Sequence, residues 1–258
     1  MAIDWIHNLV YYDFNEKLIV LNASQPILSY ILFRGEKLRY VLEICVNPLD
    51  SLLFWSISQS VSPKTAIIMR ASQDGSNQTV IVDKDLMDPS AMAIDLIPKR
   101  LYWIDRIAAN LCSSDFDGKD LKTILLSQNL FTSTYYMTIF GDTVYWSTIY
   151  HGSLLRINKF GLNGTQLNIL VKGEPGYEVE SFKIIDSSLR PKSTNRCLNN
   201  RCSHLCLPAS QDTYRCVCPQ IGVTLLALSS QHCKESVSLT INLIPSLSLH
   251  TVPIDIRF

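Results

Sequence analysis

The chain has 258 residues, enough for one large β domain or two smaller ones. Its 23 lysines and arginines balance its 23 aspartates and glutamates, so no net charge favours nucleic acid or an anionic membrane as a partner. Residues 1–5, Met-Ala-Ile-Asp-Trp, lack the basic region and the apolar run of a secretory signal peptide.

Four segments of the chain share one pattern, in which two adjacent aromatic positions lie inside a short apolar run. Residues 1–13 and 92–105 both begin Met-Ala-Ile-Asp, and two further copies keep the same register. The pairs are Tyr11 and Tyr12, Phe54 and Trp55, Tyr102 and Trp103, and Tyr145 and Trp146. Their first members are 43, 48 and 43 residues apart. A period in this range, with short strands inside it, predicts the blades of a β-propeller.

The third copy displays the elements of one repeat. Its four apolar runs, each about the length of a strand, cover residues 91–95, 101–104, 108–116 and 121–126. Asp117-Gly118 separates the last two runs, which predicts a hairpin with a type I′ turn. The second and fourth copies carry similar pairs, at Asp74-Gly75 and Asn163-Gly164. Each repeat is therefore predicted to be a four-stranded antiparallel blade, and a β-sandwich with chance spacing is the alternative.

In chain order, the predicted blades cover residues 1–24 with an outer strand in 25–38, then 39–83, 84–128 and 129–172. The run 181–186 predicts one more inner strand, so the propeller region, 1–186, holds about four blades plus one strand. Because Met1 lies inside a repeat, we expect the chain to be a fragment without its upstream blades. The two unpaired sheet edges of such a fragment would then promote aggregation.

Six cysteines lie within residues 197–233, after a polar linker at 187–196, with the spacing C-x4-C-x3-C-x9-C-x-C-x14-C. Six cysteines allow fifteen connectivities, and a zinc site that includes His204 is the alternative to disulfides. A module this small needs bridges because it cannot build a sufficient core, which indicates an oxidising compartment. Residues 234–258 are apolar but interrupted by prolines and charges, which predicts a disordered tail rather than a transmembrane helix.

Leu-Tyr-Trp-Ile-Asp at 101–105 resembles the YWTD repeat of the low-density lipoprotein receptor family. Members of that family place an epidermal-growth-factor-like (EGF-like) module directly after a six-bladed propeller. The segments C-S-H-L-C-L-P at 202–208 and Y-R-C-V-C-P at 214–219 resemble that module. The resemblance thus implies an all-β chain with an incomplete six-bladed YWTD-type β-propeller and an EGF-like module at 197–233. It also implies the disulfides Cys197–Cys206, Cys202–Cys216 and Cys218–Cys233.

Only Asp105 keeps the aspartate of the YWTD pattern, which in the family helps to tie neighbouring blades together. Phe14, Ile57 and Thr148 occupy that position in the other copies, so fewer inter-blade hydrogen bonds are expected. The segment 192–196 lacks the acidic residues that precede the first cysteine in calcium-binding EGF-like modules, so no calcium is expected. Three glycosylation sequons lie near outer turns, at Asn22, Asn77 and Asn163. Cys45 and Cys112 remain, and both are interpreted as small buried hydrophobic residues.

The sequence carries no catalytic motif: it has no glycine-rich phosphate loop, no G-x-S-x-G and no H-E-x-x-H. Asp4 and Asp95 repeat with the blades, which favours structural hydrogen bonding over catalysis. Some six-bladed propellers are metal-dependent lactonases, but the predicted inner strands here hold no cluster of histidine and glutamate. No enzymatic activity, cofactor or metal is therefore expected.

In the resembled family the propeller and EGF-like module lie on the extracellular side of an endocytic receptor, bind protein ligands or lipoproteins, and help to release ligand at acidic pH. Release there involves the receptor's own cysteine-rich ligand-binding repeats. His7 and His151 lie in predicted blade loops and are candidates for a pH switch, although a solvated loop histidine is the simpler interpretation. The alternative is a nidogen-like matrix or adhesion protein that binds a partner through the propeller face. No membrane contact is expected within this chain.

Overall fold

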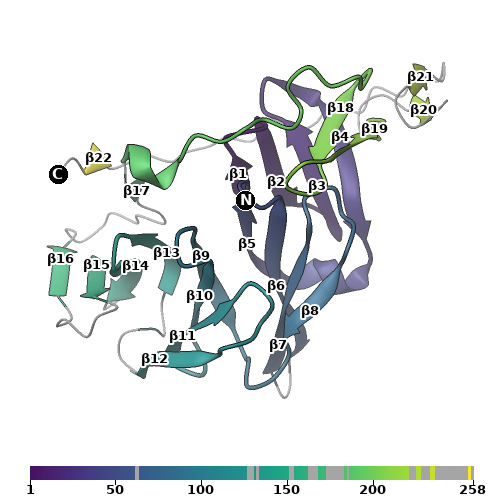
Figure 1. Ribbon diagram of the computed structural model, residues 1–258. Coiled ribbons are helices and arrows are strands. Elements are labelled where there is room, and N and C mark those ends of the chain that lie inside the picture. The colour runs from purple at the N-terminus through teal and green to yellow at the C-terminus, as the bar shows by residue number, and fades with distance from the viewer. Residues whose placement is uncertain are drawn as a thin grey trace. The chain divides into compact units, whose positions relative to one another are not determined.

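The computed structural model describes residues 1–61, 64–126, 131, 134–150, 154–161, 168–172, 183–184, 186–220, 225–227, 233–235 and 255–256. Its elements are β-strands and two short 3-10 helices, η1 (Glu36–Tyr40) and η2 (Ser187–Leu189) (Figure 1). Within these residues no helix is long and apolar enough to cross a membrane. The predicted all-β class is confirmed.

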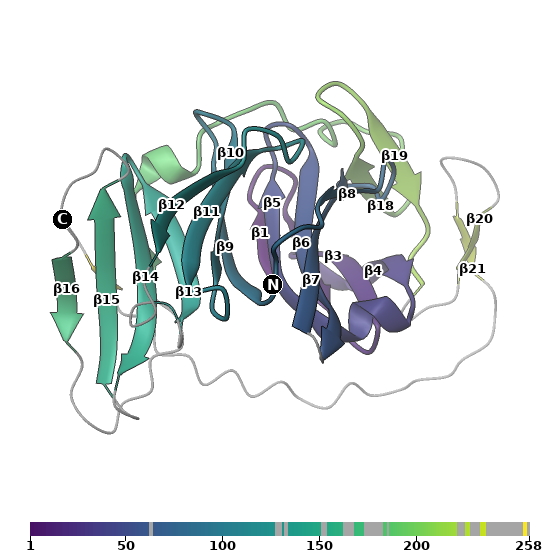
Figure 2. The same cartoon turned by 90° about the horizontal axis from the view of Figure 1, so that it is seen from below.

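Four sheets of four strands follow one another along the chain, and the strands of each sheet are neighbours in chain order. The first is β1 (Ala2–Asp4), β2 (Leu9–Asp13), β3 (Lys17–Asn22) and β4 (Gln25–Arg34). The second is β5 (Val41–Asn47), β6 (Leu52–Val61), β7 (Lys64–Ser72) and β8 (Thr79–Val82). The third is β9 (Pro89–Asp95), β10 (Arg100–Asp105), β11 (Asn110–Asp115) and β12 (Lys122–Leu126). The fourth is β13 (Thr134–Phe140), β14 (Thr143–Tyr150), β15 (Leu154–Gly161) and β16 (Asn168–Lys172), and Figure 2 shows its strands side by side.

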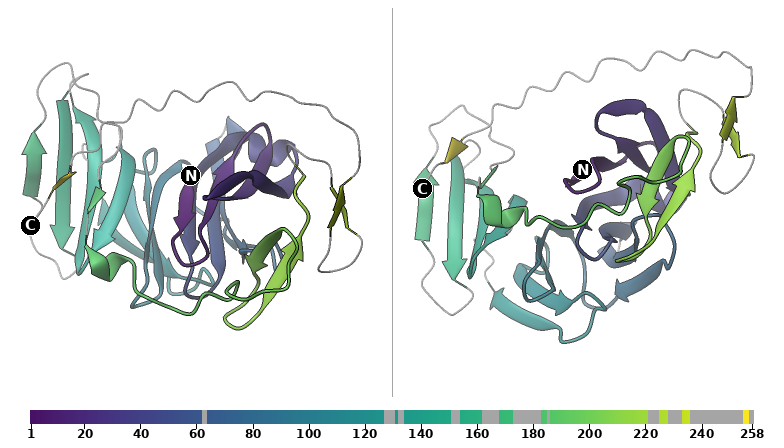
Figure 3. Two further views of the ribbon diagram at one scale, coloured as in Figure 1. Left: turned by 90° about the horizontal axis from the view of Figure 1, so that it is seen from above. Right: turned by 45° about the horizontal axis from the view of Figure 1, so that its top comes forward.

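Three two-stranded sheets complete the part of the chain that the structure describes. The strands β18 (Leu205–Pro208) and β19 (Tyr214–Val217) form a hairpin in the cysteine-rich segment, drawn in light green in Figure 3. The other pairs are β20 (Leu225–Ala227) with β21 (Cys233–Glu235), and β17 (Lys183–Ile184) with β22 (Asp255–Ile256). Of the predicted disordered tail 234–258, residues 234–235 and 255–256 are thus paired in strands, and the rest lies outside the described residues.

The chain divides into two compact units, which are described separately. The first contains Met1–Trp55, Met69–Thr79 and Lys192–Leu249, so the first blade and the cysteine-rich module share one unit. The second contains Ser56–Ile68, Val80–Pro191 and His250–Phe258, which include the third and fourth blades. The first unit joins residues that precede position 186 with residues that follow position 197. The division into a propeller region that ends at residue 186 and a module that begins at residue 197 therefore stays a prediction.

The repeated aromatic residues lie in the core, as a stack of amphipathic sheets requires. All of them except the half-buried Tyr12 are at most 8 % exposed. In the first unit, Phe33 of the first blade stacks on Trp55 of the second, with ring centroids 5.0 Å apart. In the second unit, a cluster that includes Tyr102, Ile104 and Trp146 joins the third blade to the fourth. The first blade therefore packs against the second, and the third packs against the fourth.

The Asp-Gly pairs do occupy turns between the third and fourth strands of their blades, but the predicted type I′ geometry is wrong. Gly118 has φ +77° and Gly75 has φ +88°, whereas Asp117 and Asp74 are not among the residues with positive φ. The Gly118 N–H donates to the Asp115 carbonyl at 3.2 Å, and the Asp115 N–H donates to the Lys119 carbonyl at 2.9 Å. This is a type I turn followed by a left-handed glycine, a combination typical of three-residue hairpin loops.

Candidate functional site

The turns that join the first and second strands of three blades have the same construction. Asp4, Asn47 and Asp95 end the first strands, and each accepts a hydrogen bond at Oδ1 from the backbone N–H two residues later, at 2.9, 3.0 and 3.3 Å. The fifth residue of each turn is left-handed, with φ 59° at Asn8, 56° at Ser51 and 52° at Lys99. Asp4 and Asp95 are thus structural caps, in agreement with their interpretation from the sequence.

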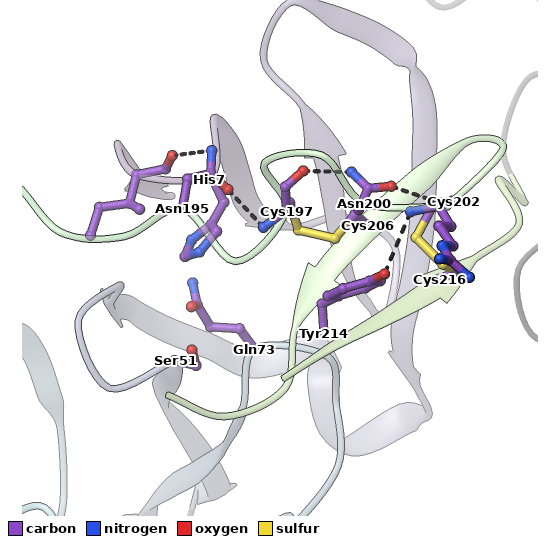
Figure 4. Close-up of a disulfide and its surroundings, with 12 residues drawn as sticks. His7, Ser51, Gln73, Asn195, Cys197, Asn200, Cys202, Cys206, Tyr214 and Cys216 are labelled. Carbon is purple, nitrogen blue, oxygen red and sulfur yellow. Dashed lines mark hydrogen bonds between the residues drawn. A yellow bond between two sulfur atoms is a disulfide. The ribbon is translucent and has the colours of Figure 1, made fainter. Parts of the chain in front are cut away.

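A buried polar cluster lies beneath the first of these turns. His7 Nδ1 is 2.6 Å from Asp4 Oδ2, and Gln73 Nε2 donates to the same oxygen at 2.8 Å. Tyr11 OH donates to the Gln73 carbonyl at 3.4 Å, and burial, with Asp4 and Asp74 nearby, raises the pKa of Tyr11 well above its ordinary value. Figure 4 shows the His7 ring next to the Gln73 side chain.

His7 corrects one expectation from the sequence. A solvated loop histidine was the simpler interpretation, but His7 is only 5 % exposed because its ring packs into the Asp4–Gln73 cluster. Its Nε2 and the Oε1 of Gln73 are buried with no hydrogen-bond partner among the described residues. His151, the second candidate, lies outside the described residues.

Three disulfides hold the cysteine-rich module together: Cys197–Cys206, Cys202–Cys216 and Cys218–Cys233. These are the pairs that the family resemblance implies. The strand pairing agrees with them, because Cys206 of β18 lies opposite Cys216 of β19 in the hairpin register. All six cysteines are therefore bonded to one another, and none is left to bind zinc with His204.

Two adjacent residues before the first cysteine attach this module to two blade turns. Asn195 Nδ2 donates to the Ile6 carbonyl in the first blade at 2.8 Å. Arg196 donates from Nη1 to the Pro48 carbonyl at 2.9 Å and from Nη2 to the Leu49 carbonyl at 2.5 Å, both in the second blade. The sequence placed Asn195 and Arg196 in a polar linker. A short polar segment before a cysteine carries no signal that would distinguish an anchor from a linker.

Side chains of the second turn also contact the module. Ser51 Oγ donates to the Ser210 carbonyl at 2.8 Å, and Gln211 Nε2 donates to Asp50 Oδ1 at 2.7 Å. Both contacts use residues of the segment between β18 and β19. They add to the two arginine bonds, so this turn is held by the segment before the first cysteine and by the loop of the hairpin.

A third group of contacts involves the second strand of the hairpin. Arg215 Nε lies 3.1 Å from Asp74 Oδ2, and its guanidinium lies 5.9 Å from the centre of the Tyr30 ring. Gln220 N–H donates to the Ser29 carbonyl of β4 at 2.8 Å. The module is therefore attached at two turns, one outer hairpin and one strand edge of the first unit.

Asp105, the one aspartate that keeps the YWTD pattern, joins two segments of the second unit. Its Oδ2 accepts from the Met87 and Asp88 amides at 2.7 and 3.0 Å, and its Oδ1 accepts from the Ile107 and Ala108 amides at 3.0 and 2.9 Å. Residues 87–88 lead from the second blade into the third. The side chain therefore fixes the entry to its own blade, in keeping with the inter-blade role that the resemblance implies.

Two sequons lie within the described residues. Asn77 is exposed and its Nδ2 donates to Ser72 Oγ at 3.1 Å. Asn22 is half-buried, and its Oδ1 accepts from the Ser24 and Gln25 amides at 2.9 and 3.1 Å. Asn163 lies outside the described residues. Glycosylation at these positions remains a prediction.

The inner strand β5 carries an unusual carboxyl group. Burial raises the pKa of Glu43 to about 7, a rise that Asp13 supports and that the Met1 amino group and the Ile44 N–H oppose. Burial, together with Glu43, also raises the pKa of the Cys45 thiol well above its usual value. Cys112 is buried and its thiol pKa is raised for the same main reason. Both thiols are therefore kept neutral. Cys112 is buried, as interpreted from the sequence, whereas Cys45 is only half-buried.

The described residues contain no group of three or more histidine, cysteine, aspartate or glutamate side chains that could hold a metal ion. In the first unit, the cysteine-rich module contacts the blades as one protein contacts another. Backbone carbonyls of the repeated turns accept hydrogen bonds from the amide of Asn195 and the guanidinium of Arg196. Fold and contacts together define a propeller with a docked, disulfide-bonded EGF-like module.

The chain is similar to two curated receptors of the low-density lipoprotein receptor family, which confirms the resemblance drawn from its motifs. It is 29 % identical over 221 residues to the vitellogenin receptor Yl of Drosophila melanogaster and 26 % identical over 217 residues to the vitellogenin receptor of Solenopsis invicta. These matches cover 85 % and 84 % of the chain but only 11 % and 12 % of the two receptors. No family model matches the chain.

Solved structures agree on the fold. A nidogen/laminin complex matches 64 % of the chain and 61 % of the compared chain, with a TM-score of 0.53 and 18 % identity. TolB from Acinetobacter baumannii matches 66 % and 42 %, with a TM-score of 0.53 and 12 % identity. At such identities these matches show a propeller-like fold alone and do not favour the nidogen-like function over the receptor function.

Proposed function

We propose that this chain is a non-enzymatic, extracellular module of an endocytic lipoprotein-receptor-like protein and that it binds protein ligands and releases them at acidic pH. The match to two vitellogenin receptors over more than four fifths of the chain carries this proposal. The disulfide-bonded module supports the extracellular location, because such bridges persist in oxidising compartments.

The geometry of the first unit supports a binding role. Its turns present backbone carbonyls to donor side chains, and its EGF-like module is anchored through Asn195 and Arg196. Such a scaffold offers preformed surfaces to a protein partner, which lowers the entropic cost of binding. Vitellogenin-like lipoproteins and the cysteine-rich ligand-binding repeats of the parent receptor are the partners that the relatives and the family resemblance suggest.

For acid-dependent release, the buried cluster around His7 is the candidate within the described residues. Protonation would place a second N–H donor at Nε2, which is buried and has no hydrogen-bond partner among the described residues, in the turn that offers the Ile6 carbonyl to Asn195. Asp4 contacts the His7 ring, and Asp4 and Asp74 both act on the buried Tyr11 of the same cluster. A change of charge in this cluster would alter the turn that supports the docked module.

Surface plasmon resonance with vitellogenin as the analyte tests the proposal. The immobilised chain should bind vitellogenin saturably at neutral pH and release it faster at about pH 5.5, where an ordinary histidine is protonated. His7→Gln should reduce this difference, whereas His204→Gln, a substitution in the cysteine-rich module, should leave it unchanged. Absence of vitellogenin binding at neutral pH would contradict the proposed function.

A further inference from the structure

The turn of the third blade repeats the two turns that receive the EGF-like module. Ile97 occupies the position of Ile6 and Leu49, whose carbonyls accept from Asn195 and Arg196. The three turns share the side-chain cap and the left-handed fifth residue described above. The third turn therefore offers its backbone in the same geometry as the two that bind donors.

The third turn differs from the other two in its exposure. Ile97 is 93 % exposed, whereas Ile6 and Leu49 are half-buried. Pro98 and Lys99, which follow Ile97, are exposed as well. The apolar surface of Ile97 is therefore available to a partner.

Two carboxylates flank this exposed turn. Asp95 caps it, and Asp142 lies in the two-residue turn between β13 and β14 of the next blade, where it is exposed. The inner strands β9 and β13 of these two blades are neighbours within the second unit. Burial raises the pKa of Asp95, and the negative charge of Asp142 raises it further.

Two basic residues, Lys99 and Arg100, follow Asp95 in the chain. Arg100 pairs with Asp120 at 2.6 Å and donates to Ser113. Lys99 carries an exposed positive charge in the turn itself, where the other turns have the neutral Asn8 and Ser51. Lys99 should therefore oppose a basic partner, and its replacement is a useful test.

We propose that the turn Asp95–Lys99, together with Asp142, is a second docking surface, which takes an extended segment of a protein partner that carries an arginine. The guanidinium would donate to the turn carbonyls, as Arg196 does in the second blade, and would pair with the two carboxylates. Apolar atoms next to the arginine would cover Ile97. The proposed docking surface depends on the proposed protein-binding function, and it specifies the chemistry of one segment of the partner.

The probe is a fluorescein-labelled peptide with the sequence of residues 192–200 and Cys197→Ser, which contains the Asn-Arg pair that the chain itself uses. Fluorescence anisotropy with the full chain should show saturable binding. The double substitution Asp95→Asn and Asp142→Asn should weaken it about five- to tenfold, the loss expected for charge-assisted hydrogen bonds. Asn47 caps the equivalent turn of the second blade, so Asp95→Asn preserves the fold.

Matched variants separate the surface from general charge effects. Asp83→Asn, at another exposed aspartate, should leave binding unchanged, while Ile97→Ser should weaken it and Lys99→Asn should strengthen it. A peptide in which alanine replaces the arginine should not bind. Lack of saturable binding, or equal binding to the double variant and the wild type, would overturn the proposal.

Peptide binding tests the second docking surface, and vitellogenin binding tests the proposed receptor function, so failure of one can be told from failure of the other. If the peptide fails while vitellogenin still binds, only the second docking surface is refuted. If the peptide binds as expected but vitellogenin does not, the receptor function is refuted and the docking surface stands.

Discussion

Arg196 and Leu49, which are 147 residues apart in the sequence, are joined by a hydrogen bond of 2.5 Å from the guanidinium to a turn carbonyl. The same side chain reaches the Pro48 carbonyl and, at 2.5 Å, the Gln211 carbonyl of its own module. One arginine thus bridges the EGF-like module and the second blade. Its planar fork of donors suits this arrangement better than a lysine would.

Replacement of Arg196 by alanine should therefore loosen the module. Three carbonyls would lose a charged donor, at a cost of about 1–3 kcal/mol for the docked state. Hydrogen exchange measured by mass spectrometry should become faster in residues 195–217 and in the turn 47–51. Arg201→Ala, at an exposed arginine of the same module, is the control, and equal exchange in both variants would show that Arg196 is not an anchor.

The Asp105 carboxylate accepts four backbone amides, so an isosteric amide cannot replace it. In Asp105→Asn one oxygen becomes an NH2 group that faces N–H donors, and two hydrogen bonds are lost. Chemical denaturation should show a loss of about 2–4 kcal/mol in unfolding free energy. Asp83→Asn should change it by less than about 0.5 kcal/mol, and a similar small effect at Asp105 would contradict the inter-blade role.

Gly118 and Gly141 form a natural pair for a steric test. Both have positive φ, +77° and +55°, so alanine strains the backbone at each. A Cβ at Gly118 would lie 1.8 Å from the Ile81 carbonyl oxygen, whereas no atom of the described residues lies within 4 Å of one at Gly141. We expect Gly141→Ala to cost about 1 kcal/mol and Gly118→Ala clearly more, measured by thermal unfolding. Equal losses would show that the backbone of Ile81 does not approach Gly118.

Glu43 should make stability depend on pH. Its pKa is raised to about 7 in the folded chain from an ordinary value of 4.5, so the folded state favours the protonated form. The unfolding free energy should thus fall as the pH rises from about 4.5 to about 7, by roughly 1–3 kcal/mol. Glu43→Gln should remove this part of the pH dependence. A wild type and a variant with parallel stability curves over that range would refute the assignment.

Much of the architecture follows from local sequence. The aromatic pairs fix the period, and the side-chain caps at Asp4 and Asp95 repeat with it, so blade number and register were predictable from the residues. The turn type at Asp117-Gly118 was not, because the same dipeptide fits a type I′ turn and the glycine position of a longer loop.

The docking contacts were not predictable from the sequence, for a physical reason. Asn195, Arg196 and Arg215 act on carbonyls or carboxylates more than 140 residues away, and no period or local pattern encodes such pairs. The burial of His7 was missed for the same reason. Its neighbour Gln73 comes from another blade and closes the cluster over the ring.

The most direct test of the receptor function compares binding at two pH values. The analyte is a recombinant pair of cysteine-rich ligand-binding repeats of the low-density lipoprotein receptor type, passed over the immobilised chain at about pH 7.4 and about pH 5.5. In the proposed function the repeats displace the ligand from the chain at acidic pH. The chain should therefore bind the repeats more tightly at about pH 5.5 than at about pH 7.4, and His7→Gln should reduce this difference. Equal affinity of the wild-type chain for the repeats at both pH values would contradict acid-dependent release.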